Sequence, residues 1–263
     1  MKIAICQTAG IPGQIGKNLD LMKQSATAAA EGGAELLIFP EMYLSGYNIG
    51  KVLNRLAEPP DGPASQLAAI IARETGIALL YGYPEKSPDG IFNSALLINS
   101  RGELQANCRK THLYGKAEKQ QFLLGDGLVN TELNGINVGI LICYDVEFPE
   151  AVRSLTLAGA DLIAVPTALM KPFCRIIDIV IEARAYENQV YVAYANRCGS
   201  EGEMQYCGRS TVAGPDGGIT AQAGTGAEIL YAEIDRTTIS EERKDNPVLA
   251  DRRPELYGST DKE

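Results

Sequence analysis

Short apolar runs of strand length alternate along the chain with longer segments whose apolar residues recur at helical spacing. In the segment 63–74, for example, Leu67, Ile70 and Ile71 share one helical face, and Gly76 follows as a stop signal. We expect helices at 18–31, 63–74, 149–157 and 172–188. We expect strands at 2–8, 35–40, 77–83, 93–99, 104–109, 137–143, 161–165, 190–196, 208–213 and 228–234. This alternation predicts an α/β fold in which helices cover mixed sheets.

The chain carries no internal signal of a domain boundary. No long Pro-rich, Ser-rich or charged tract divides it. With 263 residues, 45% of them hydrophobic, it is long enough for one large core, so we favour a single domain over residues 1–263. The stretch from about residue 236 onward is polar, and we expect it to form an arm-like, partly disordered tail.

The charge and hydropathy of the chain limit the classes of partner that it is expected to bind. A formal net charge of −9 disfavours binding to nucleic acid or anionic lipid. No apolar run reaches the roughly 18 residues that span a bilayer, and the apolar run 3–6 is too short for a signal-peptide core. We therefore expect a cytoplasmic protein that acts on a small molecule.

The cysteines give no sign of a metal site. None of the six forms a C-x-x-C pair, so neither zinc binding nor a dithiol redox motif is indicated. In a cytoplasm all six are expected to stay reduced, most of them as small core residues. They are Cys6, Cys108, Cys143, Cys174, Cys198 and Cys207.

Cys143 is the first candidate for chemistry. The apolar run 137–143 ends in this cysteine, and Pro149 suits the first turn of a following helix. A cysteine at such a strand–turn–helix junction is placed like a nucleophile, and nearby amides can donate hydrogen bonds to a developing oxyanion. The alternative interpretation is a buried cysteine that ends a strand.

A nucleophilic cysteine needs a base to take its proton. The chain has one histidine, His112, so only this residue could be the base of a catalytic Cys–His pair. A carboxylate can serve if burial raises its pKa, and Glu41 follows an apolar strand, where sites gather in parallel α/β sheets. Lys110 follows a hairpin strand and could stabilise both thiolate and oxyanion. Taken singly, Glu41 is equally compatible with a solvated strand-end position, and Lys110 would most often be a surface lysine.

Three motifs together resemble the nitrilase, or carbon–nitrogen hydrolase, superfamily and follow its order. They are residues 39–41 (Phe-Pro-Glu), 109–114 (Arg-Lys-Thr-His-Leu-Tyr) and 143–150 (Cys-Tyr-Asp-Val-Glu-Phe-Pro-Glu). The resemblance extends from residue 2 to about 235. It includes later landmarks at 196–197, 208–210 and 214–217. The fold that it implies is an α-β-β-α sandwich, and members commonly form homodimers or larger even assemblies.

The resemblance also implies a role for each site residue. Glu41 corresponds to the general base, Lys110 to the cationic stabiliser and Cys143 to the nucleophile. Glu118, eight residues after the lysine, matches a second glutamate that holds substrate and catalytic groups in place. The amide of Tyr144 would share the oxyanion with Lys110. The implied reaction is amide hydrolysis through a cysteine thioester, without metal or organic cofactor.

Within the family, residues 143–145 (Cys-Tyr-Asp) look like those of amidase branches, whereas nitrilases proper usually show Cys-Trp-Glu. An N-carbamoyl amine or acid hydrolase is the alternative enzyme, and a non-catalytic ligand-binding member of the fold is the alternative of another class. Branches that cleave dicarboxylate monoamides often carry arginine where this chain has Glu147. We therefore expect Glu147 to contact substrate and to favour neutral or cationic amides, unless Arg175 or Arg197 supplies the missing charge.

Three further features have structural interpretations. The glycines of 10–16 follow G-x-x-G-x-x-G spacing rather than that of a dinucleotide-binding loop, so we expect a turn. Arg184 and Glu187 are spaced to form an ion pair on a helix. His112 is expected to be a supporting side chain near Lys110.

Overall fold

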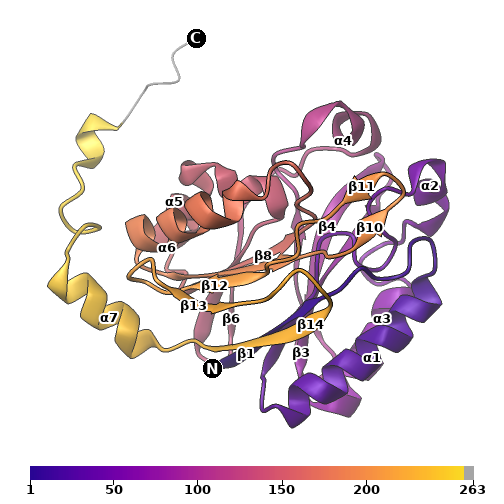
Figure 1. Cartoon of the computed structure of the whole chain (residues 1–263), viewed down its shortest axis with the longest axis horizontal. Coiled ribbons are helices and arrows are strands. Elements are labelled where there is room, and N and C mark those ends of the chain that lie inside the picture. Colours follow the sequence, from indigo (N-terminus) through magenta and orange to yellow (C-terminus); the bar gives the residue numbers. More distant parts are fainter. Residues whose placement is uncertain (258–263) are drawn as a thin grey trace.

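A computed structural model of the chain describes residues 1–257 and contains two six-stranded mixed sheets (Figure 1). The first sheet consists of β1 (Lys2–Gln7), β2 (Leu36–Ile38), β3 (Ala78–Lys86), β4 (Ile91–Ile98), β5 (Leu104–Arg109) and β14 (Glu228–Glu233), in the order β14-β1-β2-β3-β4-β5. The second consists of β6 (Val129–Leu133), β7 (Ile136–Ile140), β8 (Leu162–Thr167), β9 (Tyr191–Asn196), β12 (Thr211–Ala213) and β13 (Ile219–Gln222), in the order β13-β12-β9-β8-β7-β6.

The remaining elements connect or cover the sheets. The α-helices are α1 (Ile15–Glu31), α2 (Leu53–Leu56), α3 (Pro63–Thr75), α4 (Gly115–Gln121), α5 (Pro149–Leu157), α6 (Glu182–Asn188) and α7 (Arg236–Asp245). Short helical turns are η1 (Gly50–Val52), η2 (Cys143–Glu147), η3 (Ile177–Ile181) and η4 (Pro254–Leu256). A small hairpin, β10 (Ser200–Glu201) with β11 (Met204–Gln205), lies outside both sheets.

Strand direction brings several carboxyl ends to one edge of each sheet. In the first sheet β1, β2 and β3 are parallel. Because β4 is antiparallel to β3 and β5 is antiparallel to β4, β5 runs in the direction of β2 and β3. In the second sheet β7, β8 and β9 are parallel. The loops that follow these strands therefore gather where α/β proteins usually place their sites.

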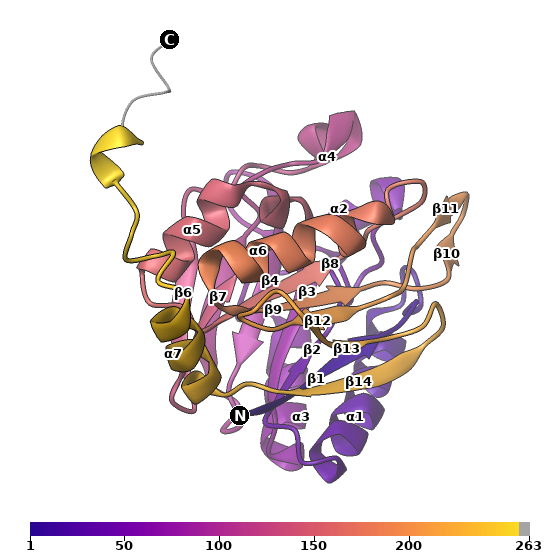
Figure 2. The ribbon, with the colours of Figure 1, turned by 60° about the vertical axis from the view of Figure 1, so that its left-hand side comes forward.

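Alternating side chains along the strands build three apolar layers. On β1, Ile3 and Ile5 point into the core between the sheets, whereas Ala4 and Cys6 pack against α1 and α3. The second sheet alternates in the same way and turns its outer face to α5 and α6. Each fully buried Ile, Leu or Val contributes about 1.5–3 kcal/mol through removal from water. Figure 2 shows α5 and α6 on one side of the sheets and α1 and α3 on the other, which confirms the predicted α-β-β-α sandwich.

Most predicted elements are present, with shifted ends. Helix α5 has the predicted bounds. The strand predicted at 137–143 ends earlier, at Ile140, because the chain turns at Cys143 into η2 with a backbone φ of 49° that no strand accommodates. The turn predicted for the glycine-rich segment 10–16 is present, and helix α1 begins at Ile15 rather than at Asn18.

The helix predicted to open at Pro172 is wrong in its first part. Residues 171–174 form a turn, and the helical segment continues through η3, a π-helix, into α6. The main-chain amide of Lys171 donates a hydrogen bond to the carbonyl of Gln205 (2.9 Å). This tie to β11 keeps the segment out of a helix, although proline suits a first helical turn.

The polar stretch from residue 236 begins with a helix rather than an arm. The side chain of Asp235 caps α7 by accepting a hydrogen bond from the amide of Thr237 (2.8 Å). Beyond α7 the chain extends away from the sandwich (Figure 1). The last part of the predicted tail, residues 258–263, lies outside the described residues. Among the helices of residues 1–257, none combines the length and the apolar character needed to cross a membrane.

Candidate active site

The segments that carry the predicted site residues meet at the carboxyl ends of the strands. Glu41 lies three residues beyond the end of β2, and Lys110 immediately follows β5. Cys143 lies three residues beyond the end of β7 and begins η2. Strands from both sheets therefore contribute to one site.

Lys110 is the centre of a buried charge cluster. Its Nζ donates hydrogen bonds to Oε1 of Glu41 (2.7 Å) and to Oε1 of Glu118 (2.8 Å), and its side chain has no exposed surface. The side-chain amide of Asn93 donates a second hydrogen bond to Oε1 of Glu41 (2.7 Å). The surface interpretation of Lys110 and Glu41 is thereby excluded. The second oxygen of Glu41, Oε2, is buried and has no hydrogen-bond partner within the described part of the chain.

Glu118 is held in place from two sides. It lies on α4, and its Oε2 accepts a hydrogen bond from the amide of Tyr114 (2.7 Å). Its Oε1 accepts a hydrogen bond from the hydroxyl of Tyr47 (2.6 Å). Tyr47 is a site residue that the sequence analysis missed, because it lies in an irregular loop where neither alternation nor helical spacing marks a position.

Asp145 fixes the backbone around Cys143. Its Oδ1 accepts hydrogen bonds from the amides of Thr111 (3.2 Å) and His112 (2.8 Å), and its Oδ2 accepts one from the amide of Ile142 (3.0 Å). These bonds join the loop after β5 to the loop after β7. The His112 ring stacks on Phe148 (centroids 3.8 Å apart), with Nδ1 2.9 Å from Asp145 Oδ1. The His112 ring thus contacts both Asp145 and Phe148 and is placed to support the loop after β5.

The electrostatics of the cluster favour a neutral thiol in the resting state. Burial raises the pKa of the Cys143 thiol well above its ordinary value, and the Glu41 carboxylate adds to this, whereas Lys110 opposes it. Burial also raises the pKa of Glu41, against the effect of Lys110. Burial alone would favour neutral Lys110, but the surrounding acidic groups raise its pKa instead. The cluster thus combines a protonated thiol, a carboxylate of raised pKa and a fixed ammonium group.

Cys143 opens into a cavity of about 200 Å³. Aromatic rings form much of its wall, and the segment 168–170 closes one side. Glu147, which the sequence analysis expects to contact substrate, is also among the residues that line this cavity. The aromatic lining residues are Tyr47, Tyr114, Tyr144 and Phe173. A cavity of this size suits a small substrate.

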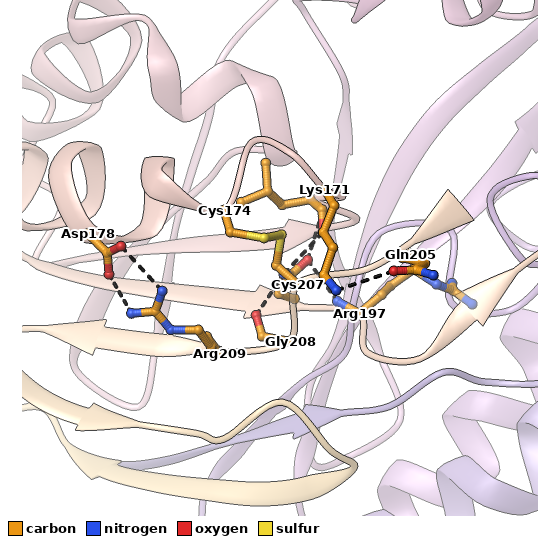
Figure 3. Close-up of a disulfide and its surroundings, with 10 residues drawn as sticks. Lys171, Cys174, Asp178, Arg197, Gln205, Cys207, Gly208 and Arg209 are labelled. Carbon is orange, nitrogen blue, oxygen red and sulfur yellow. Dashed lines mark hydrogen bonds and ion pairs between the residues drawn. A yellow bond between two sulfur atoms is a disulfide. The ribbon is translucent and has the colours of Figure 1, made fainter. Parts of the chain in front are cut away.

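A disulfide between Cys174 and Cys207 reinforces one wall of the cavity (Figure 3). The expectation that all six cysteines are reduced is therefore wrong for this pair. The two residues are 33 positions apart, so no short spacing marked them in the sequence. The segment 168–170 lies just before Cys174, and the amide of Cys207 donates a hydrogen bond to the carbonyl of Leu169 (2.9 Å). The disulfide thus holds a cavity-lining segment to the hairpin side of the molecule.

A buried ion pair holds the loop that carries Glu41 and Tyr47. Arg197 donates hydrogen bonds to the carbonyl oxygens of Glu41 and Met42 (both 3.2 Å), and it pairs with Glu201 (2.5 Å). Glu201 in turn accepts a hydrogen bond from the amide of Tyr47 (2.9 Å). Met42 has a left-handed backbone (φ 50°), which persists only where surrounding contacts impose it. The Arg197 guanidinium is thus bonded to this loop and to Glu201, and Arg197 does not line the cavity.

The ion pair predicted between Arg184 and Glu187 is present, and its arginine also bonds the segment that follows Cys143. Arg184 pairs with Glu187 (2.8 Å). The same guanidinium donates hydrogen bonds to the carbonyl oxygens of Val146 (2.9 Å) and Glu147 (2.8 Å). Arg184 therefore anchors the end of η2 to α6.

Comparison with known proteins places this fold and site in one class. The sequence profile of carbon–nitrogen hydrolases matches residues 2–244. The chain is 48% identical to a Pseudomonas protegens protein described as a hydrolase in the pqqF 5′ region, with 100% of this chain and 92% of that protein covered. It is 34% identical to an (R)-stereoselective amidase of Pseudomonas sp., with 98% and 93% covered.

Solved structures give the same result. The amidase NitN of a Nesterenkonia species superposes with a TM-score of 0.88 at 35% identity, with 98% of each chain covered. A variant of that amidase carries the acetamide moiety of fluoroacetamide bound covalently at its active-site cysteine (TM-score 0.88, 34% identity, 98% and 95% covered). The chain belongs to the carbon–nitrogen hydrolase family and lies in an amidase-like branch of the nitrilase superfamily. It is an enzyme that acts on non-peptide carbon–nitrogen bonds.

Proposed function

We propose that this enzyme hydrolyses small carboxamides to carboxylate and ammonia through a thioester at Cys143. The observation that carries the proposal is the buried cluster of Glu41, Lys110 and Glu118 beside the cysteine in a cavity of about 200 Å³. The covalent adduct at the cysteine of the similar Nesterenkonia amidase supports the same chemistry.

Acylation uses the free oxygen of Glu41. Oε2 takes the thiol proton of Cys143 as Sγ attacks the carbonyl carbon, and the carbonyl electron pair moves to oxygen. Nζ of Lys110 and the amide of Tyr144, in the first turn of η2, donate hydrogen bonds to this oxyanion. When the tetrahedral intermediate collapses, the carbon–nitrogen bond breaks and Glu41 returns the proton to nitrogen. Ammonia leaves, and the acyl group stays on Cys143.

Deacylation repeats the sequence with water. Glu41 takes a proton from water as its oxygen attacks the thioester carbon, and the carbon–sulfur bond breaks on collapse of the second intermediate. The thiolate recovers its proton from Glu41, and the carboxylate product leaves. Glu118 does not exchange protons in this scheme. It keeps Lys110 oriented between the two carboxylates.

An assay of ammonia release across carboxamides, nitriles and N-carbamoyl amines tests the proposal. We expect ammonia and carboxylate in equal amounts from small carboxamides. Ammonia with carbon dioxide from N-carbamoyl compounds alone would instead identify a carbamoyl hydrolase. Absence of turnover with all three classes, together with a Cys143 thiol inert to alkylating amides, would favour a ligand-binding protein.

We further propose that the enzyme is a homodimer that uses the outer face of α5 and α6. Leu157, Ile179 and Tyr186 are large apolar residues on or beside these helices, and each is about half exposed. We also propose that it works in the cytoplasm. A reducing compartment would keep Cys143 as a thiol, whereas the Cys174–Cys207 disulfide, which such a compartment tends to reduce, counts against this location.

A further inference from the structure

Glu147 is a charged group that the proposed chemistry does not use. It lines the same cavity as Cys143 and is half-buried. Within residues 1–257 no group donates a hydrogen bond to its carboxylate, because the nearby guanidinium of Arg184 bonds its main-chain carbonyl instead. Burial raises the pKa of Glu147, and the charges of Arg184 and Lys110 oppose this shift without reversing it.

The cavity has an excess of negative charge. Glu147 is the one charged residue among the described residues that line the cavity, and the buried cluster of Lys110 with Glu41 and Glu118 carries one further negative charge when all three groups are ionised. Lys110 cannot neutralise Glu147 closely, since its Nζ is bonded to the other two carboxylates.

No arginine forms an ion pair with the Glu147 carboxylate in the part of the chain that the structure describes, although the charge of Arg184 acts to lower its pKa. Arg197 is fully buried in its pair with Glu201, and Arg184 is bonded to carbonyl oxygens and to Glu187. Arg175 is exposed and does not line the cavity. The charges that could have favoured an anionic substrate are therefore absent from the cavity wall.

The aromatic walls complete a surface suited to a cation. Tyr114 packs edge-on against Tyr144 (centroids 5.3 Å apart) and against Phe173 (6.1 Å). Ring faces attract an ammonium within about 6 Å, and more strongly where water is excluded. A carboxylate beside aromatic rings is the combination that binds alkylammonium groups.

We infer that the preferred substrates are small amides whose acyl group carries a protonated amine, with the ammonium held by Glu147 among the aromatic rings. This inference rests on the proposed amide hydrolysis and adds a substrate class to it. The net charge of −9 would also favour the approach of cations. Amides that carry a carboxylate would meet the Glu147 carboxylate and would be excluded.

Three amides of matched length test the inference: β-alaninamide, butyramide and succinamate, which end in an ammonium, a methyl and a carboxylate group. We expect kcat/KM to fall in that order, with β-alaninamide about ten- to hundredfold above butyramide, as for one hydrogen bond between charged groups. The difference should lie mainly in KM, because Glu147 binds the substrate away from the reacting carbon.

Two variants distinguish a specific effect of Glu147 on substrate preference from a general effect of negative charge. In Glu147→Gln the ratio of kcat/KM for β-alaninamide over butyramide should fall about tenfold or more. In Glu150→Gln, which removes an exposed carboxylate three residues away and outside the cavity, the ratio should not change. An unchanged ratio in Glu147→Gln, or a wild-type preference for butyramide or succinamate, would overturn the inference and leave amide hydrolysis standing.

Failure of the proposed function can be distinguished from failure of the inference. If none of the three amides were hydrolysed, calorimetric binding to the Cys143→Ala variant would still measure the preference. Tighter binding of β-alaninamide than of butyramide would then support the ammonium site. Equal or weaker binding would overturn it.

Discussion

Cys143 adopts a backbone conformation that an L-residue keeps only under constraint. Its φ of 49° is imposed where the chain leaves β7, and the hydrogen bonds of Asp145 hold both flanking loops. The nucleophile is thus presented at the first residue of η2, where main-chain amides without helical partners surround it.

The clustering of Glu41, Lys110 and Glu118 near Cys143 could be predicted from the sequence, whereas the residues that bond them could not. The motifs around Glu41, Lys110 and Cys143 resemble known ones in type and order. Asn93 and Tyr47 are single polar or aromatic residues on a strand and in a loop, and only the three-dimensional structure shows that they bond Glu41 and Glu118.

Replacement of Glu41 separates the two candidate bases. We expect Glu41→Gln to slow acylation by about 10²–10⁴-fold, since it removes the general base. His112→Asn should cost much less, because its ring supports Asp145 and Phe148 from the edge of the site. Pre-steady-state ammonia release measures the acylation rate of both variants. A larger loss in His112→Asn than in Glu41→Gln would reverse the assignment of the base.

The pH dependence of kcat/KM should report the raised pKa of Glu41. A base acts in its deprotonated form, so activity is present above its pKa and is lost as the pH falls through it. Because burial raises the pKa of Glu41, the acid limb should lie above the ordinary value of 4.5. A titration of kcat/KM with a neutral amide measures this limb. A midpoint at or below 4.5 would contradict the role of Glu41.

At the scale of elements, helices and strands with a clear hydrophobic period were predicted correctly. Segments whose conformation depends on long-range contacts were not. Helix α5 has a proline at its first turn and an apolar face, and its bounds follow from sequence alone. Pro172 favours the first turn of a helix, yet residues 171–174 form a turn. Contacts with residues distant in sequence determine this conformation. These are the bonds to β11 and the disulfide between Cys174 and Cys207.

Removal of the disulfide should loosen the cavity wall. The cross-link closes a loop of 33 residues, which in the chain-entropy model stabilises the fold by about 3–4 kcal/mol. We therefore expect Cys174→Ser with Cys207→Ser to lower Tm and to raise KM for small amides, through the adjoining segment 168–170. Thermal unfolding and steady-state kinetics measure both effects.

Reductant supplies the control for this prediction. Treatment of the wild-type enzyme should reproduce the effects of the double variant, and the variant itself should not respond. The Arg209–Asp178 ion pair also holds this region and is unaffected by reductant (Figure 3). Unchanged Tm and KM after verified reduction would show that the disulfide has no part in shaping the cavity.

At the scale of the whole molecule, the two sheets share one core. Side chains from strands of both sheets, such as Ile5 and Ile140, belong to a single buried cluster, and Ile239 of α7 joins it. On this basis we propose that the chain forms one domain. Patterning along the strands predicts this arrangement well, because each strand alternates between the shared core and a helix layer.

The proposed dimer has a direct test. Light scattering should give twice the chain mass of 28.2 kDa at micromolar concentration. A charge at the centre of the exposed face, Ile179→Asp, should shift the mass toward the monomer. The matched control Leu104→Asp alters a residue of similar exposure on β5 and should leave the mass unchanged. A wild-type mass of 28.2 kDa would contradict the proposal.

The central claim is that Cys143 forms a thioester during amide hydrolysis. The most direct measurement is intact-protein mass spectrometry after rapid acid quench with butyramide, followed by peptide mapping. We predict a mass increase equal to the butyryl group on the peptide that contains Cys143, which decays as butyrate appears. The Cys143→Ala variant should show no adduct and a loss of turnover of about 10⁴-fold or more, with an unchanged fold by circular dichroism. Full turnover without any adduct, or activity of Cys143→Ala within tenfold of the wild type, would contradict the account.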